Sequence, residues 1–314
     1  MKKLAIILFV LTLGSGVHAQ QRPQYALYFQ NNYILNPALS GIEEFYDTKL
    51  SYRSQWVGIN GAPVTSYFSI QGPTSSATFN DAPRAHGGIG ATVIQDQTGP
   101  TGRLTANASF AYHVLLSESV KISLGLSGGV TQYTLKVNQL VFDQAFDPAA
   151  PKAGASQIVP DLTAGVWIYG EQFFVGGSIN QLLPSQINYG TSDKNPQNAL
   201  RSHQFVTAGI RIPLGETITY TPSIMVKRIS PAPISFDFNN RFQFGDKFWL
   251  GGSYRRGDGF SACAGFYVNS LLNVSYAYDY TASPLQSVTS GSHEIILGLQ
   301  LFNPSHVRCP KMNW

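Results

Sequence analysis

One stretch, residues 234–244, constrains the fold more than any other part of this 314-residue chain. Its apolar residues share one parity: Ile234, Phe236, Phe238, Phe242 and Phe244. The opposite parity is wholly polar: Ser235, Asp237, Asn239, Arg241 and Gln243. Successive side chains of a strand point to opposite faces, so this segment has one apolar and one polar face. The pattern predicts a membrane-spanning strand with lipid on one side and a polar lumen on the other.

The same alternation recurs along the chain and predicts 14 strands. They cover 47–56, 64–71, 87–95, 102–115, 120–135, 160–169, 173–182, 204–214, 217–227, 234–244, 248–255, 260–269, 272–280 and 293–302. From the fourth strand onward, short turns alternate with longer loops, as in outer-membrane barrels with short periplasmic turns. The connection over residues 72–86 breaks this rule, because a short turn is expected there. Barrels of about 12 or 16 strands also fit the pattern.

The expected fold is therefore all-β, an antiparallel transmembrane outer-membrane β-barrel of about 14 strands over residues 47–302. Charged residues make up only 12% of the chain, against about 25% in soluble domains. A soluble sandwich is the alternative fold. Its dry interior would bury charged side chains without water, which is unfavourable. Those side chains are Arg211, Asp237, Arg241, Arg255 and Asp279.

The two ends of the chain read as separate segments. Residues 1–19 have a basic start, a short apolar run and a small-residue cleavage site at Ala19, so a signal peptide is expected. Residues 20–46 are polar and aromatic without clean alternation, which predicts a periplasmic or lumen-entering segment. Residues 303–314 form an expected periplasmic tail. The expected location is the cell outer membrane, with the lipid bilayer as a partner.

Charge and cysteine content narrow the functional classes. The formal net charge is +4, and it becomes +2 without Lys2 and Lys3, which gives no reason to expect nucleic acid as a partner. Cys263 and Cys309 are the only cysteines. An exported protein permits a bridge between them, but two unpaired thiols are favoured. Their spacing fits no zinc pattern, and neither a metal site nor a cofactor is expected.

The chain is expected not to be an enzyme and to have no catalytic residues. Gly125–Gly129 matches the G-x-S-x-G pattern around Ser127. A nucleophile elbow needs a strand, a sharp turn and a helix, whereas strand-like residues follow here. A glycine in such a strand more often marks a bend or a close approach. A barrel hydrolase that uses Ser127 stays open as a third hypothesis.

Four charged residues are expected to face the lumen: Asp237, Arg241, Arg255 and Asp279. Cross-strand pairing of neighbours suggests that Asp237 pairs with Arg241, and Arg255 with Asp279. Such pairs would fix the register of the strands. The alternative is that these charges select solutes in a pore.

Four stretches resemble a known family. The first contains Gln24, Tyr25 and Asn36–Gly41, and the second runs from Tyr52 to Thr65. The others are Ser292–Glu294 and Arg308–Pro310. Together they resemble the PorP/SprF proteins over the full chain. The most specific part is the run Arg-x-Gln-Trp-x-Gly-x-x-Gly-Ala-Pro, which starts at Arg53.

The resemblance implies a non-enzymatic outer-membrane component of the type IX secretion system of Bacteroidota, often tied to gliding motility. Such members aid secretion or surface attachment of large exported proteins. The implied partners are periplasmic ring proteins, a peptidoglycan-binding linker protein and the exported surface proteins. Candidate residues for a loop or docking surface are Arg53, Gln55, Trp56, Gly58, Gly61 and Pro63; simple strand-end anchoring is the alternative. An outer-membrane diffusion channel or hydrophobic-solute transporter is the alternative function.

Overall fold

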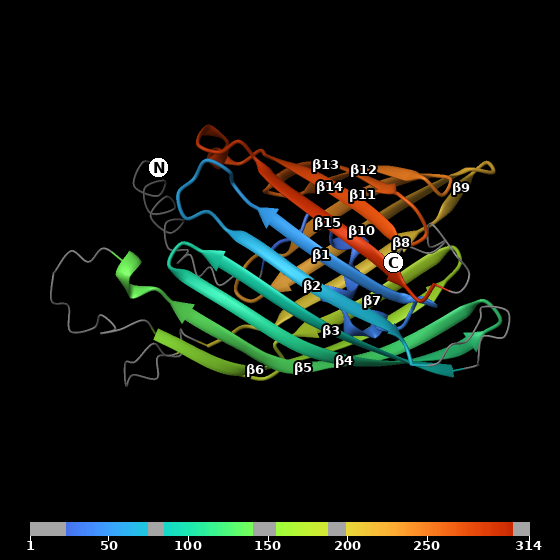
Figure 1. Cartoon of the computed structure of the whole chain (residues 1–314), viewed down its shortest axis with the longest axis horizontal. Helices are drawn as coiled ribbons and strands as arrows, with labels where there is room; N and C mark the ends of the chain where they lie inside the picture. Colours follow the sequence, from blue (N-terminus) through green and yellow to red (C-terminus); the bar gives the residue numbers. More distant parts are fainter. Residues whose placement is uncertain (1–22, 75–84, 141–154, 188–198, 304–314) are drawn as a thin grey trace, which may run out of the picture.

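The computed structural model describes residues 23–74, 85–140, 155–187 and 199–303. Its strands form one antiparallel sheet that closes on itself (Figure 1). The circle closes because β1 pairs with both β2 and β15, and β10 pairs with β11. The strands are β1 (Tyr46–Ser54), β2 (Val64–Pro73), β3 (Ala85–Thr98), β4 (Thr101–Ser117), β5 (Val120–Leu135), β6 (Ala155–Gly170), β7 (Phe173–Asn180), β8 (His203–Ile210), β9 (Ile212–Leu214), β10 (Ile218–Ile229), β11 (Ser235–Phe244), β12 (Phe248–Arg255), β13 (Gly259–Tyr267), β14 (Leu272–Thr281) and β15 (Ser292–Leu301).

The predicted fold is confirmed: the molecule is a closed barrel of 14 antiparallel strands. Strands β8 and β9 both pair with β10 and act as one wall strand that breaks at Arg211. The sequence predicted an unbroken strand there. Arg211 instead turns toward the β6–β7 connection, where Nη1 donates to the carbonyl oxygens of Gly170 (3.0 Å) and Glu171 (2.9 Å).

Strand β6 begins at Ala155, five residues before the predicted start at Pro160. Proline has no N–H to donate to a strand ladder and is usually confined to edge strands or strand ends. In the structure β7 pairs with β6 only from Thr163 onward. Pro160 therefore lies where the strand has a partner on one side alone, and its missing donor is tolerated.

Along the strands, apolar side chains point outward and polar side chains point into the lumen, as the alternation predicts. On β11, Phe238 and Phe242 are exposed on the outer face, whereas Asp237, Asn239 and Arg241 are buried in the lumen. Leu124 and Leu126 of β5 are 63% and 60% exposed. An apolar outer surface of this kind suits lipid rather than water. Within the described ranges, no helix has the length and apolar character to cross a membrane.

The barrel has two different ends (Figure 1). The long-loop end carries the connections after β1, β3, β5, β7, β10, β12 and β14. The short-turn end carries the turns after β4, β6, β9, β11 and β13, together with the first residue of β1 and the last of β15. The connection after β2, which seemed too long for this end, includes residues 75–84 and so lies partly outside the described residues.

Residues 23–45, called the plug segment below, lie inside the lumen. They contain three short 3-10 helices: η1 (Tyr28–Gln30), η2 (Asn32–Ile34) and η3 (Pro37–Leu39). Further 3-10 turns, η5 (Val137–Gln139) and η7 (Pro284–Ser287), lie in long loops. Every residue from Tyr25 to Gly41 except Gln30 is buried. Since the strands turn polar faces inward, this segment supplies much of the apolar material of the core.

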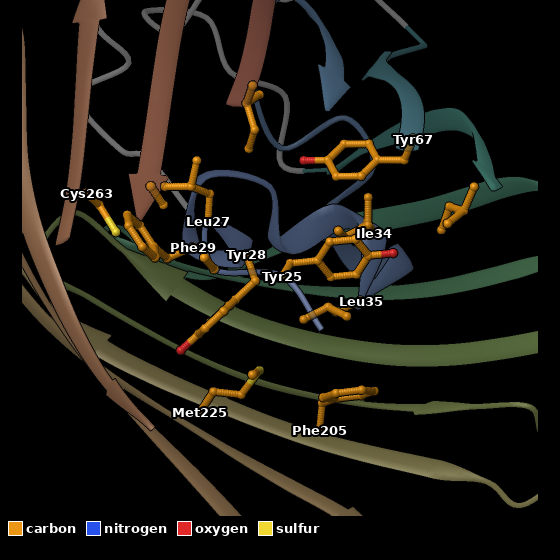
Figure 2. Packing of buried hydrophobic residues seen from close by; sticks show 14 of the residues in the cluster. Tyr25, Leu27, Tyr28, Phe29, Ile34, Leu35, Tyr67, Phe205, Met225 and Cys263 are labelled. Atoms are coloured by element: carbon orange, nitrogen blue, oxygen red, sulfur yellow. The ribbon is translucent and has the colours of Figure 1, made fainter. Parts of the chain in front are cut away.

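The apolar core lies between the plug segment and the barrel wall (Figure 2). Phe29 packs edge-to-face on Trp249 of β12, with ring centroids 5.6 Å apart. Tyr25 packs likewise on Tyr67 of β2 at 5.5 Å. Edge-to-face aromatic pairs add about 0.5–1.5 kcal/mol beyond the area they bury. The plug segment therefore contacts wall strands that are not neighbours in the sheet.

Candidate functional site

The plug segment is fixed to the wall by a turn that begins at Asn36. Its side-chain Oδ1 accepts a hydrogen bond from Ala38 N (3.0 Å) and so caps η3. Its Nδ2 donates to the carbonyl oxygens of Val166 on β6 (3.1 Å) and Gly177 on β7 (3.2 Å). One amide side chain thus holds the turn together and joins it to two wall strands.

Three wall glycines allow this turn to approach closely. A Cβ at Gly88 would lie 1.8 Å from the Ser40 oxygen, and one at Gly125 would lie 2.3 Å from Ala38 N. A Cβ at Gly165 would lie 1.9 Å from Asn36 Oδ1. No larger residue fits at these positions without moving the plug segment. The Gly125 position is the close approach considered for the G-x-S-x-G stretch, which continues as strand within β5.

Wall side chains also satisfy the backbone of the turn. His113 Nε2 donates to the Ser40 oxygen (2.8 Å), and Ser123 Oγ donates to the Ala38 oxygen (2.6 Å). Gly41 N donates to Gln71 Oε1 at 2.6 Å. These buried groups would otherwise be unpaired, at a cost of about 1–3 kcal/mol each. The polar lumen face therefore binds a polypeptide, its own amino-terminal segment.

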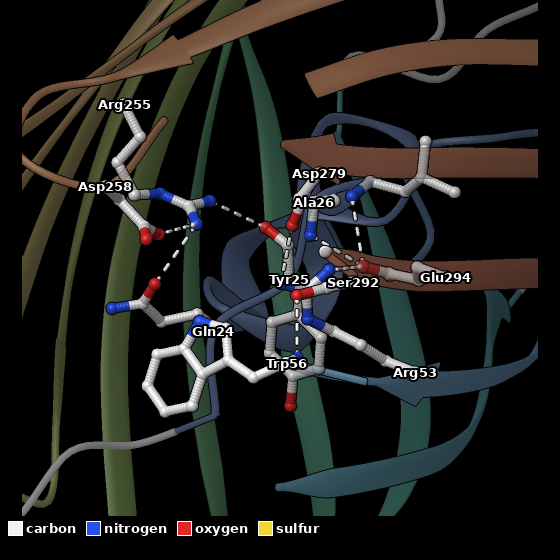
Figure 3. A network of polar contacts seen from close by, with 12 residues as sticks. Gln24, Tyr25, Ala26, Arg53, Trp56, Arg255, Asp258, Asp279, Ser292 and Glu294 are labelled. Carbon is white, nitrogen blue, oxygen red and sulfur yellow. Dashed lines mark hydrogen bonds and ion pairs between the residues drawn. The ribbon is translucent and has the colours of Figure 1, made fainter. Parts of the chain in front are cut away.

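A second attachment lies at the long-loop end (Figure 3). Glu294 Oε2 accepts hydrogen bonds from Ala26 N (2.6 Å) and Leu27 N (3.4 Å). Arg53 pairs with Glu294 (3.4 Å) and with Asp279 (2.6 Å). The Arg53 side chain is 2% exposed, so its contacts are with this network and not with bulk solvent.

Arg255 forms the other half of this network. Its guanidinium pairs with Asp237 (3.0 Å) and Asp258 (3.1 Å). It also donates to Gln24 Oε1 (3.1 Å) and to the Tyr25 oxygen (3.2 Å). We call Arg53, Asp237, Arg255, Asp258, Asp279 and Glu294 the clamp. Each of its two arginines pairs with two carboxylates, and the clamp holds the start of the plug segment.

The structure corrects the charge pairing expected from the sequence. Asp237 lies directly opposite Arg255 in the β11–β12 register and pairs with it, whereas Arg241 was expected. Asp279 pairs with Arg53 of β1, whereas Arg255 was expected. Neither expected pair joins adjacent strands, since Asp237 and Arg241 both lie on β11 and β13 separates Arg255 from Asp279. Arg53 reaches Asp279 across β15, which lies between β1 and β14.

The candidate docking residues on the loop after β1 divide into two groups. Gln55, like Arg53, is buried, and Gln55 N donates to the Pro63 oxygen (2.9 Å). Trp56 N donates to Ser292 Oγ (3.0 Å), which joins this loop to β15. Gly58 and Gly61 are exposed and have φ values of +103° and +73°, which favour glycine. The first group fixes the loop, and the second lies on its surface.

Small cavities lie among the described residues of the lumen. Three cavities lined by described residues have volumes of about 20, 40 and 10 Å³. Ser127 lines the first, whose walls contain no histidine or carboxylate. Among the described residues no group of histidine, cysteine and acidic side chains could hold a metal. Cys263 is buried and unpaired, and Cys309 lies outside the described residues.

Burial shifts the pKa values of groups on the plug segment, among them Tyr33 and Glu43. Burial raises the pKa of the Tyr33 phenol to about 12, and its hydroxyl lies 2.7 Å from Ser109 Oγ. Burial, followed by the negative charge of Asp47, raises the pKa of Glu43 to about 8. Glu43 lies at the short-turn end of the plug segment and lines the 40 Å³ cavity with Asp47.

Sequence reasoning missed the main partner of the plug segment. Glu294 was noted only as part of a strand-opening motif, although it is on the polar parity of β15. A carboxylate at a lumen position was therefore a usable signal. The identity of its partners, the backbone amides of Ala26 and Leu27, was not readable from the wall sequence.

These features define the class: an outer-membrane β-barrel whose lumen is filled by its own amino-terminal segment. The family model of the type IX secretion system membrane protein PorP/SprF matches residues 17–299. The chain therefore belongs to the PorP/SprF family. None of the curated proteins matches it.

Several solved structures are similar to this chain. The CymD monoaromatic hydrocarbon channel is 11% identical with a TM-score of 0.49, and the match covers 87% of this chain and 93% of that one. A TodX deltaS2S3 mutant, also a monoaromatic hydrocarbon channel, is 9% identical with a TM-score of 0.48, and covers 87% and 94%. A Pseudomonas aeruginosa FadL homologue is 9% identical with a TM-score of 0.45, and covers 84% and 91%.

Proposed function

We propose that this protein is a non-enzymatic component of the type IX secretion system that aids secretion or surface attachment of large exported proteins. In this proposal it belongs to the gliding-associated members of the family. The observation that carries the proposal is a family match over residues 17–299 in a barrel whose lumen is already occupied. A barrel with an occupied lumen would bind its partners through its two ends and its outer face.

The plug segment weighs against the alternative, an outer-membrane diffusion channel or hydrophobic-solute transporter. The largest of the three cavities has about 40 Å³, whereas an engineered protein cavity that binds benzene has about 150 Å³. Conduction would require the plug segment to leave the clamp and the wall glycines together.

The two barrel ends suit two sets of partners. Short turns face the periplasm in barrels of this kind, so the short-turn end would meet the periplasmic ring proteins and the peptidoglycan-binding linker. The long-loop end would meet the exported surface proteins. The exposed part of the loop after β1, around Gly58 and Gly61, belongs to this second surface.

A deletion strain tests the proposal directly. Loss of the gene should strip large exported proteins from the cell surface, and the intact gene should restore them. A strain that still displays them in full would contradict the proposed role. In planar bilayers the purified protein should show no large steady conductance. A stable open pore would favour the channel alternative.

A further inference from the structure

The plug segment begins at the long-loop end. Gln24 and the Tyr25 oxygen bind Arg255, which is the last residue of β12. Ala26 N binds Glu294, which lies opposite Arg53 in the β1–β15 register. Arg53 is one residue from the end of β1, at the same end of the barrel. Two independent contacts thus fix the start of the segment.

The plug segment finishes at the opposite end. Gly41 N binds Gln71, which pairs with Asp47 near the start of β1. The Gly41 oxygen lies 3.1 Å from His86 Nε2, and His86 is the second residue of β3. The chain therefore crosses the lumen once, from the long-loop end to the short-turn end, before β1 turns back.

The few residues before the plug segment are too short to carry the amino terminus back across the lumen. Four residues separate the predicted cleavage site after Ala19 from Gln24, and they span at most about 14 Å. The nine residues of β1 extend about 30 Å along the strand, or about 23 Å of barrel height at a usual tilt. A mature amino terminus that starts near Gln24 cannot reach the short-turn end.

We infer that a mature amino terminus close to Gln24 is presented at the long-loop end, beside the loop after β1, whereas the described chain ends with Asn303 on the opposite face. Gln24 would then share a surface with the exposed Gly58 and Gly61. Periplasmic partners would not reach them. Only the statement that this face is the outside rests on the proposed function.

Three epitope tags on the full-length protein test the inference. One follows Gln21, one lies in the loop after β10 beside Pro233, and one follows Trp314. In intact cells, antibody should reach the first two tags and miss the third until the outer membrane is opened. An amino-terminal tag that behaves like the carboxyl-terminal tag overturns the inference. If the first two tags are hidden together and the third is reached, the inference stands and the outward orientation fails.

Single cysteines repeat the test without an insertion. Gln24→Cys is compared with Pro233→Cys in an exposed long loop and Glu216→Cys in an exposed short turn. Labelling with a membrane-impermeant maleimide is measured against the parent protein, which contains Cys263 and Cys309. Gln24→Cys should be labelled from the same side as Pro233→Cys. Labelling from the side of Glu216→Cys overturns the inference.

Discussion

Gly125→Ala isolates the contact between the plug segment and the barrel wall. The new Cβ would lie 2.3 Å from Ala38 N and 2.4 Å from the Pro37 carbonyl carbon. Normal van der Waals separation is about 3.5 Å or more, so the turn must move away by about 1 Å. Because Gly125 points into the lumen and its strand pairing is made by backbone atoms, the barrel wall should keep its register.

The size of the effect follows from the bonds that this shift would stretch. Ser123 Oγ to the Ala38 oxygen (2.6 Å) and His113 Nε2 to the Ser40 oxygen (2.8 Å) would both exceed hydrogen-bonding distance. Two such bonds at about 1 kcal/mol each, with some overpacking strain, give about 2–4 kcal/mol. That favours release of the turn by about 30- to 1,000-fold.

Hydrogen–deuterium exchange of plug-segment peptides over residues 33–41 is the assay, in detergent, with the barrel strands as internal reference. The matched control is Gly128→Ala, three residues along β5, where a Cβ has no neighbour within 4 Å. Exchange over 33–41 should rise in Gly125→Ala and not in Gly128→Ala. Equal protection in the two variants would refute the close contact and the energy derived from it.

Three further changes test other parts of the structure. Glu294→Ala should make residues 24–28 sensitive to protease, because the clamp loses their acceptor and leaves Arg53 with one fewer partner; the exposed Glu216→Ala should not. Since the folded pKa of Glu43 is raised to about 8, the folded state binds more protons than the unfolded state between about pH 4.5 and 8. Thermal stability should therefore fall as pH rises through that window, and Glu43→Gln should lose this dependence. Leu126→Arg should destabilise the barrel by about 2–4 kcal/mol if it lies near the bilayer midplane. The control is Val288→Arg, because Val288 is 59% exposed against 60% for Leu126 but lies in a long loop. It should lower the free energy of unfolding by less than Leu126→Arg does. Equal losses in a reversible unfolding titration would argue against a lipid-facing Leu126.

The barrel wall was predictable because each strand carries its own signal. The alternation on residues 234–244 places Phe238 outside and Asp237 inside without reference to any other strand. Turn residues then limit each strand to within a few positions. Two strand bounds were predicted wrongly because neighbouring elements decide them. Arg211 breaks its strand to bond the β6–β7 turn, and Pro160 is tolerated within β6 because β7 does not pair with it.

The path of the plug segment was not predictable in the same way. Its residues show no period, and its turns are stabilised by wall groups far away in the chain, such as Val166 for Asn36. The partner of Asp279 was missed for a related reason. Cross-strand rules apply to adjacent strands, whereas Arg53 and Asp279 lie on strands separated by β15. Long side chains inside a lumen can skip a strand, and no pairwise rule along the sequence anticipates that.

Parts of three motifs by which the sequence resembles its family serve to attach the plug segment. Glu294, which pairs with Arg53, binds the backbone of residues 26–27, and the Asn36–Gly41 turn fits against wall glycines. Because Arg53 is almost fully enclosed, a partner protein cannot contact it without displacing the plug segment. Within the most specific run, Arg53 thus supports the attachment of the plug segment through Glu294, whereas a surface that recognises exported protein would use the exposed part of the same loop, at Gly58, Asn60 and Gly61. Substitutions at Arg53 should therefore reduce the amount of assembled barrel, whereas substitutions at Asn60 should leave assembly intact and act only on partner binding.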